Sequence, residues 1–144
     1  MLPKLWISGG RFQRTEDRKE KRVSDQIQSF EDLKVYKRAY KLSIELHQLS
    51  LSMPVNEQYA LADQIRRASK SICSNLAEGF SRRISSVKDF KRFIVMSLGS
   101  SDEMRVWLSY CKDLGYMDEL TWKRFREEYT EISKMLQGLY KNWH

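Results

Sequence analysis

Residues that interrupt regular secondary structure are scarce in this sequence of 144 residues. It contains only two prolines, Pro3 and Pro54, and six glycines. Because proline and glycine mark most turns, so few of them exclude a fold of many short strands and favour a few long helices. No segment alternates apolar and polar residues with the period of two expected of a strand, and no internal repeat is present. The length suits one domain.

Residues that bind metals are also scarce. The two cysteines, Cys73 and Cys111, lie far apart and match no zinc-ligand spacing, so we expect packed free thiols, as in a reducing cytosol. The two histidines are His47 and His144. Glu45 precedes His47 by two residues, whereas di-iron helical bundles need Glu-x-x-His pairs. The sequence therefore predicts no metal site and no cofactor.

Catalytic and targeting motifs are absent as well. The sequence contains no phosphate-binding Walker loop and none of the patterns GxGxxG, GxSxG or HExxH. No apolar run approaches the roughly 18 residues of a membrane span, and residues 1–10 lack the apolar centre of a signal peptide. We therefore expect a cytoplasmic protein that is not an enzyme and does not enter a membrane.

Four segments carry apolar residues at alternating steps of four and three, the pattern of a helix that packs along one seam. They span about 31–51, 55–78, 86–114 and 118–143, and their seams start at Val35, Leu61, Phe90 and Phe125. We expect Gly79 to end the second helix and residues 81–86 to form a loop. Short links between four such helices predict an all-α fold, an antiparallel up-down four-helix bundle over residues 30–144.

The first helix has a second apolar stripe beside its seam, formed by Leu33, Tyr36, Tyr40 and Ile44. Two stripes indicate contact with more than one neighbour. One interpretation is that the second stripe meets a neighbouring subunit, and the other is that both stripes pack inside one chain.

Residues 1–29 differ from the rest because they contain too few large apolar residues to fold alone, which predicts a disordered N-terminal extension. Two alternatives remain open. The segment is a basic arm that grips phosphates, or it is an extension ahead of the domain's true start. The arm would use Arg11, Arg14, Arg18, Lys19, Lys21 and Arg22.

Basic residues outnumber acidic residues, with 26 Lys and Arg against 19 Asp and Glu, for a net charge of +7. Eight of the basic residues lie between positions 66 and 92, opposed only by Glu78 and Asp89. A hairpin of the second and third helices would carry them as one basic ridge that binds phosphates without reading bases, and the alternative is a solvated surface. The candidate nucleic-acid-binding residues are Arg66, Arg67, Lys70, Arg82, Arg83, Lys88, Lys91 and Arg92.

Small and polar residues interrupt the seams of the second and third helices near their middle. Small residues let two backbones approach closely, so we expect the two stretches to meet as a structural polar seam. The acidic members lack the partners that a metal or acid–base site would need. The predicted seam comprises Ser74, Asn75, Glu78, Gly79, Gly99 and Glu103.

The sequence from Gln64 to Phe80 gives the chain a family resemblance. Within it, Gln-Ile-Arg-Arg-Ala is followed by Ser-Ile-x-Ser-Asn-Leu-Ala-Glu-Gly-Phe, and Leu98-Gly99-Ser100 and Leu114-Gly115-Tyr116 occur downstream. From position 30 to about 140 the chain resembles bacterial 23S rRNA intervening-sequence proteins. That resemblance implies a four-helix bundle that assembles as a cyclic homopentamer and brings no established catalytic activity. The family is similar in fold to the accessory protein of diversity-generating retroelements, which binds nucleic acid and a reverse transcriptase.

Two functional hypotheses follow. The first is a non-enzymatic, oligomeric nucleic-acid-binding protein, directed to RNA through its phosphates. The second is a protein–protein scaffold with no nucleic-acid role, whose basic surface meets an acidic partner.

Overall fold

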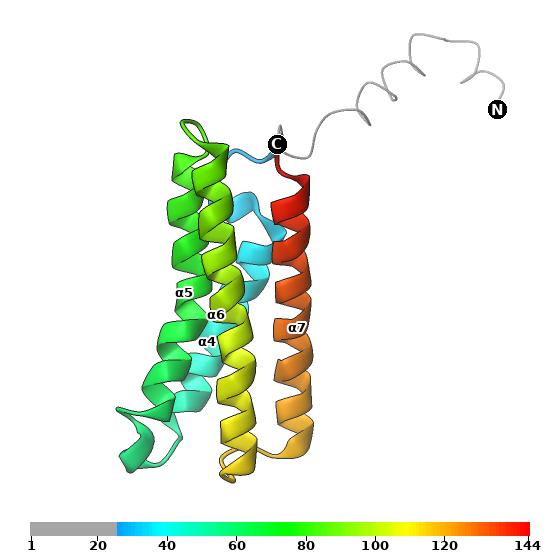
Figure 1. The fold of residues 1–144 in the computed structure, drawn as a ribbon. Coiled ribbons are helices and arrows are strands. Elements are labelled where there is room, and N and C mark those ends of the chain that lie inside the picture. Colours follow the sequence, from blue (N-terminus) through cyan, green and yellow to red (C-terminus); the bar gives the residue numbers. More distant parts are fainter. Residues whose placement is uncertain (1–25) are drawn as a thin grey trace, which may run out of the picture.

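The computed structural model describes residues 26–144, and all regular structure in this part of the chain is helical. Four long helices run alternately up and down the molecule, so that neighbours in sequence are antiparallel (Figure 1). This arrangement confirms the predicted four-helix bundle. Residues 1–25 lie outside the described residues. They include the whole of the alternative basic arm and most of the extension, 1–29, that is predicted to be disordered. The elements are η1 (Phe30–Asp32), α4 (Lys34–Leu51), η2 (Val55–Glu57), α5 (Leu61–Arg82), α6 (Val87–Asp113) and α7 (Glu119–Asn142).

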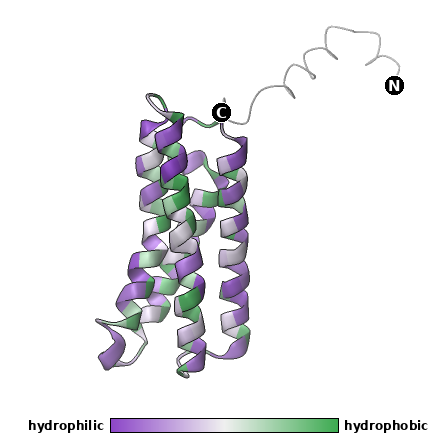
Figure 2. Ribbon diagram, viewed as in Figure 1, coloured by the Kyte–Doolittle hydropathy of each residue, from purple (hydrophilic) through white to green (hydrophobic). Residues whose placement is uncertain are grey.

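The core fills the space between the helices, as the predicted seams require. Every predicted seam residue is buried except Leu49, Asn75 and Leu139, which are half-buried. Hydrophobic residues concentrate where helices face one another, while hydrophilic residues dominate the outer faces (Figure 2). Helix α5 packs most extensively against α6, whereas α4 and α7 meet only loosely. The helices of the bundle are therefore packed tightly between α5 and α6 and loosely between α4 and α7.

Two helices begin at side chains that bind free backbone N–H groups. The Ser86 hydroxyl accepts a 3.0 Å hydrogen bond from the N–H of Asp89 at the start of α6. The Asp118 carboxylate accepts a 2.7 Å hydrogen bond from the N–H of Thr121 at the start of α7, and this bond lowers the pKa of Asp118. Such caps satisfy donors that a helix cannot pair internally, so they fix where α6 and α7 begin.

The prediction that Gly79 ends the second helix is wrong, because α5 continues through it to Arg82. The reason lies in the neighbouring helix. A Cβ atom on Gly79 would lie 2.4 Å from the Cβ atom of Phe93 on α6, far inside contact distance. Glycine is therefore required here for close helix packing rather than for a helix end, and the link to α6 is shorter than predicted.

Serine side chains join α6 to both of its neighbours. The Ser97 hydroxyl donates to the backbone carbonyl of Ile72 on α5 over 3.0 Å. The Ser101 hydroxyl donates to the carbonyl of Tyr129 on α7 over 3.1 Å and lies 2.8 Å from the hydroxyl of Ser133. These serines are buried, so α6 is held between α5 and α7 by hydrogen bonds inside the core.

The cysteines confirm the prediction of packed free thiols, because Cys73 and Cys111 are both buried and unpaired. Burial in apolar surroundings raises the pKa of each thiol to about 11. Among residues 26–144 no helix is both long enough and apolar enough to cross a bilayer.

Candidate nucleic-acid interface

The structure separates the eight predicted basic residues into two groups instead of one continuous ridge. Arg66, Arg67 and Lys70 lie near the beginning of α5, beside the end of α4. The other five surround the turn from α5 to α6, at the opposite end of the bundle (Figure 1). Fifteen residues of helix separate Arg67 from Arg82, a rise of about 22 Å. We call these five residues the upper cluster: Arg82, Arg83, Lys88, Lys91 and Arg92.

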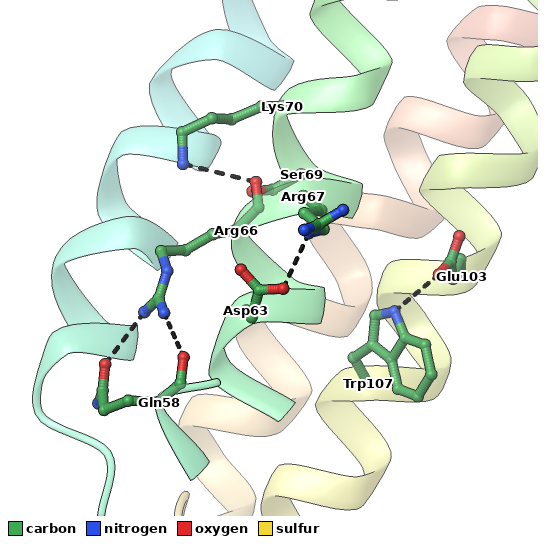
Figure 3. Close-up of polar contacts among 8 residues, drawn as sticks. All are labelled: Gln58, Asp63, Arg66, Arg67, Ser69, Lys70, Glu103 and Trp107. Carbon is green, nitrogen blue, oxygen red and sulfur yellow. Dashed lines mark hydrogen bonds and ion pairs between the residues drawn. The ribbon is translucent and has the colours of Figure 1, made fainter. Parts of the chain in front are cut away.

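The Arg66 side chain forms its hydrogen bonds within its own chain, so it is not free to bind phosphates as predicted. Its guanidinium donates to the backbone carbonyl of Gln58 over 2.6 Å and to the Gln58 side chain over 3.3 Å (Figure 3). It also donates to the Ser50 hydroxyl over 2.9 Å. The side chain is half-buried. Since its donors are used to fasten the link between α4 and α5, Arg66 is a structural residue.

The other two residues of this group are also partly engaged. The Arg67 guanidinium pairs with the carboxylate of Asp63 over 2.8 Å, although 76% of its side chain is exposed (Figure 3). The Lys70 ammonium lies 2.9 Å from Nδ1 of His47. Desolvation and the nearby Arg66 charge lower the pKa of Lys70. Since Arg66 is used within the fold, the beginning of α5 offers two cations to a polyanion, whereas the upper cluster offers five.

The upper cluster is built around the ring of Phe93, which is itself buried. The Arg82 and Arg92 guanidinium carbons lie 5.1 and 4.9 Å from the ring centre. Each arginine has one acidic neighbour along its own helix, Glu78 at 3.0 Å from Arg82 and Asp89 at 3.8 Å from Arg92. The ring thus holds two cations at the α5–α6 end through cation–π contacts.

Arg83 completes the α5 side of the upper cluster. Its guanidinium carbon lies 3.7 Å from the ring centre of Phe80, and it donates to the carbonyl of Phe80 over 2.9 Å. This double contact ends α5 and fixes the side chain, leaving it half-buried. The Arg83 cation is therefore held close to Phe80, at the end of α5.

The α6 side of the upper cluster opens onto a groove shared with the end of α7. Lys88 is exposed and forms no ion pair with any residue in 26–144. The Lys91 ammonium lies 5.1 Å from the ring centre of Tyr140 on α7. Sequence reasoning missed Tyr140 because only the fold brings it to residues almost fifty positions earlier. The groove is lined by Val87, Lys88, Asp89, Lys91, Arg92, Val95, Tyr140, Trp143 and His144.

The predicted polar seam is only partly formed. Gly79 packs against α6, and Asn75 donates to the carbonyl and hydroxyl of Ser71 over 2.9 and 3.0 Å. The Ser71 hydroxyl in turn accepts a 3.0 Å hydrogen bond from Ser100 on α6. Asn75 therefore contributes indirectly to the contact between α5 and α6.

The prediction is wrong for four residues of this seam, which are exposed: Ser74, Glu78, Gly99 and Glu103. Ser74 bonds to its own helix, and a Cβ atom on Gly99 would meet nothing within 4 Å. Glu103 accepts a 3.0 Å hydrogen bond from the indole of Trp107 (Figure 3). The hydroxyls that do join the helices are buried, as in Ser97 and Ser101. Both serines lie at seam positions of the third predicted helix, and that position is the signal that could have identified them.

In the part of the chain that the structure covers, no three histidine, cysteine or acidic side chains come close enough together to hold a metal ion.

Comparison with known proteins gives the chain a family. The sequence model of the 23S rRNA-intervening sequence protein matches residues 31–138. A crystal structure of a protein of unknown function from the S23 ribosomal protein family of Bacteroides thetaiotaomicron is similar, with 25% sequence identity and a TM-score of 0.67. That similarity covers 74% of this chain and 95% of the other. No protein with curated annotation matches. The chain therefore belongs to the 23S rRNA-intervening sequence protein family.

Proposed function

We propose that this protein binds nucleic acid, RNA in particular, through phosphate contacts made by the upper cluster, and that it is not an enzyme. The observation that carries the proposal is the gathering of five cationic side chains at one end of the bundle. Asp89 is the only acidic residue between positions 82 and 92 of the sequence. A concentrated positive field of this kind attracts polyanions and carries no information about base sequence.

The ion pairs of the upper cluster do not prevent such binding. The Arg82–Glu78 and Arg92–Asp89 pairs are at the surface, with 44% and 60% of the arginine side chains exposed. Exposed pairs of this type contribute about 0–1 kcal/mol, so a phosphate can replace the carboxylate at little cost. The cation–π contacts to Phe93 meanwhile keep both guanidinium groups at the tip of the bundle.

We further propose that the protein acts as a cyclic homo-oligomer, a pentamer as the family resemblance implies. Apolar side chains lie uncovered on two outer faces. On α4, Tyr40 and Ile44 are 52% and 47% exposed, and on α6, Val106 and Tyr110 are 50% and 52% exposed. Contact between such faces in neighbouring copies would cover them. A ring would also present several upper clusters to one polynucleotide and raise the overall affinity.

The test is a titration of a fluorescently labelled oligonucleotide, read by anisotropy at several salt concentrations. We expect the logarithm of affinity to fall linearly with the logarithm of salt concentration. Replacing Lys88, Lys91 and Arg92 by Gln is expected to make the slope shallower by about 2–3, roughly one for each lost phosphate contact. The control replaces Lys112, Lys123 and Arg126 by Gln, which removes the same charge at the opposite end of the bundle. Equal losses in both triple variants, or no binding at low salt, would contradict the proposal.

A second candidate is the scaffold, favoured by exposed apolar residues in the link between α4 and α5. Tyr59 is 97% exposed, Val55 88% and Leu51 56%, and the hydrogen bonds from Arg66 to Gln58 hold this link in place. A protein partner such as a reverse transcriptase would cover these side chains. Affinity capture before and after nuclease treatment separates the candidates. Partners that survive digestion favour the scaffold, and partners lost on digestion favour nucleic-acid binding.

A further inference from the structure

We infer that the groove between the start of α6 and the end of α7 is a stacking site for an unpaired base, so that the preferred ligand is a single-stranded polynucleotide. This inference rests on the proposed function and narrows it. A phosphate-binding cluster by itself holds single strands and duplexes alike, because both expose their phosphates. The groove adds an aromatic surface, which a duplex cannot use because its bases are already stacked on one another.

The aromatic surface is the ring of Tyr140. Tyr140 is 42% exposed and lines the groove. Among residues 26–144, the cation over this ring is the Lys91 ammonium, 5.1 Å from the ring centre. Lys91 forms no ion pair with any carboxylate in residues 26–144, so its ammonium is free to turn to a phosphate when a base takes its place.

One residue that lines the groove, Trp143, belongs to the hydrophobic core. Trp143 is only 6% exposed, and its ring packs edge-on against Phe90 and Phe80, with centroid distances of 5.0 and 6.0 Å. This indole is therefore part of the core and not a stacking surface. It anchors the last turn of α7, and so it holds Tyr140, three residues earlier on the same helix, at a fixed position beside α6.

The opposite wall supplies the phosphate contacts. Lys88 and Arg92 are both exposed and stand one helical turn apart on α6, with Cβ atoms about 5–6 Å apart at this spacing. They flank the groove into which the Tyr140 ring is exposed. Cations along one wall and an aromatic ring on the other are the two components of sequence-tolerant single-strand binding sites.

The experiment measures the affinity of the full chain for a labelled 20-nucleotide oligo(U) and for a duplex of the same length, at one low salt concentration. Tyr140→Ala is expected to weaken oligo(U) binding about 5- to 150-fold, the range for loss of one stacked base, and to change duplex binding less than about twofold. Tyr140→Phe is expected to bind oligo(U) like the unmodified chain, because stacking needs the ring and not the hydroxyl. Tyr59→Ala, in the link between α4 and α5 at the opposite end of the bundle and 97% exposed, is the matched control and is expected to change neither affinity.

The outcomes distinguish this inference from the proposed function. If Tyr140→Ala weakens single-strand and duplex binding equally, or weakens neither, the stacking site is overturned while phosphate binding stands. The same holds if Tyr140→Phe loses as much as Tyr140→Ala. If the unmodified chain binds neither ligand at low salt, the proposed function itself fails. Circular dichroism of each variant confirms that the helices are retained.

Discussion

The Cα atom of Gly79 on α5 faces Phe93 on α6 so closely that a Cβ atom on Gly79 would lie 2.4 Å from the Cβ atom of Phe93. The obstructing atom is the root of a side chain and cannot move without its helix. The same phenylalanine carries two cations of the upper cluster, Arg82 and Arg92, on its ring. This close contact between α5 and α6 and the upper cluster therefore share one residue.

The first prediction concerns this contact. Gly79→Ala forces α5 and α6 apart, and we expect the free energy of unfolding to fall by about 1–3 kcal/mol, since overpacked cores lose amounts of this order. Urea denaturation followed by circular dichroism measures the change.

Gly99→Ala is the matched control, because Gly99 is an exposed helical residue with open space around its Cα atom. Here alanine only improves helix propensity, and we expect a gain of about 0.5–1 kcal/mol. Equal effects of the two substitutions would contradict the packing role of Gly79.

The second prediction separates a structural arginine from its exposed neighbour. Arg66→Ala leaves the carbonyl of Gln58 and the hydroxyl of Ser50 without their donor, and we expect a loss of about 1–3 kcal/mol in unfolding free energy. Arg67→Ala removes only a surface ion pair and is expected to cost less than about 0.5 kcal/mol. Thermal and urea unfolding of both variants checks this, and a greater loss for Arg67→Ala would reverse the assignment.

The third prediction concerns thiol reactivity. Only the thiolate reacts with iodoacetamide, and burial raises the pKa of Cys73 and Cys111 from 9.0 to about 11. At pH 8 the native thiols are therefore expected to react about 100-fold more slowly than those of the chain unfolded in urea. Mass spectrometry of the alkylated chain over time measures both rates. Native thiols that react at the denatured rate would show that these side chains are not buried.

The fourth prediction gives the pH dependence that these thiols imply. Because their pKa is higher in the folded chain, the folded state retains protons that the unfolded state releases between about pH 9 and pH 11. Their contribution to stability is therefore complete below pH 9 and is lost as the pH rises toward 11. Urea denaturation at pH 8, 9 and 10 is expected to show a decline that is smaller in the variant Cys73→Ala. A rise in stability over this range would contradict the assignment.

The fifth prediction concerns the buried ring of Tyr129. Its hydroxyl has no hydrogen-bond partner within residues 26–144, and burial raises its pKa. Removing an unsatisfied polar atom while keeping the ring relieves a desolvation cost, so we expect Tyr129→Phe to raise the unfolding free energy by about 1 kcal/mol. Tyr129→Ala, which removes the ring as well, is expected to lower it by about 3–5 kcal/mol. Calorimetry of both variants provides the measurement.

The helices and the core could be predicted from the sequence because both depend on local order along the chain. Steps of four and three place Ile65, Ala68 and Ile72 on one face of a helix whatever the rest of the molecule does, and all three are buried. Pro54 and the glycine and serine residues between the seams indicate where the helices are separated by turns. Residues that act through neighbours distant in sequence were less predictable.

Gly79 illustrates the limit. A glycine near the end of an amphipathic run commonly ends a helix, and the reason that this one does not is Phe93, which belongs to the next helix. Arg66 illustrates it again, because the acceptors that engage it come from α4 and from the link after it. Tyr140 has no basic residue close to it in sequence except Lys141, and its place in the groove follows only from the packing of α7 against α6.

The loose side of the bundle also determines where it opens first. Between α4 and α7 the contacts include two surface ion pairs, Arg38 with Glu128 and Glu45 with Arg124, beside a groove lined by Val35, Met135 and Leu139 among others. Surface pairs weaken as salt is added, whereas the packed contact of α5 with α6 does not. Backbone amides of α4 should therefore exchange with deuterium sooner than those of α5, and increasingly so at high ionic strength. The first helix would detach as a unit, while the hairpin that carries the upper cluster stays folded.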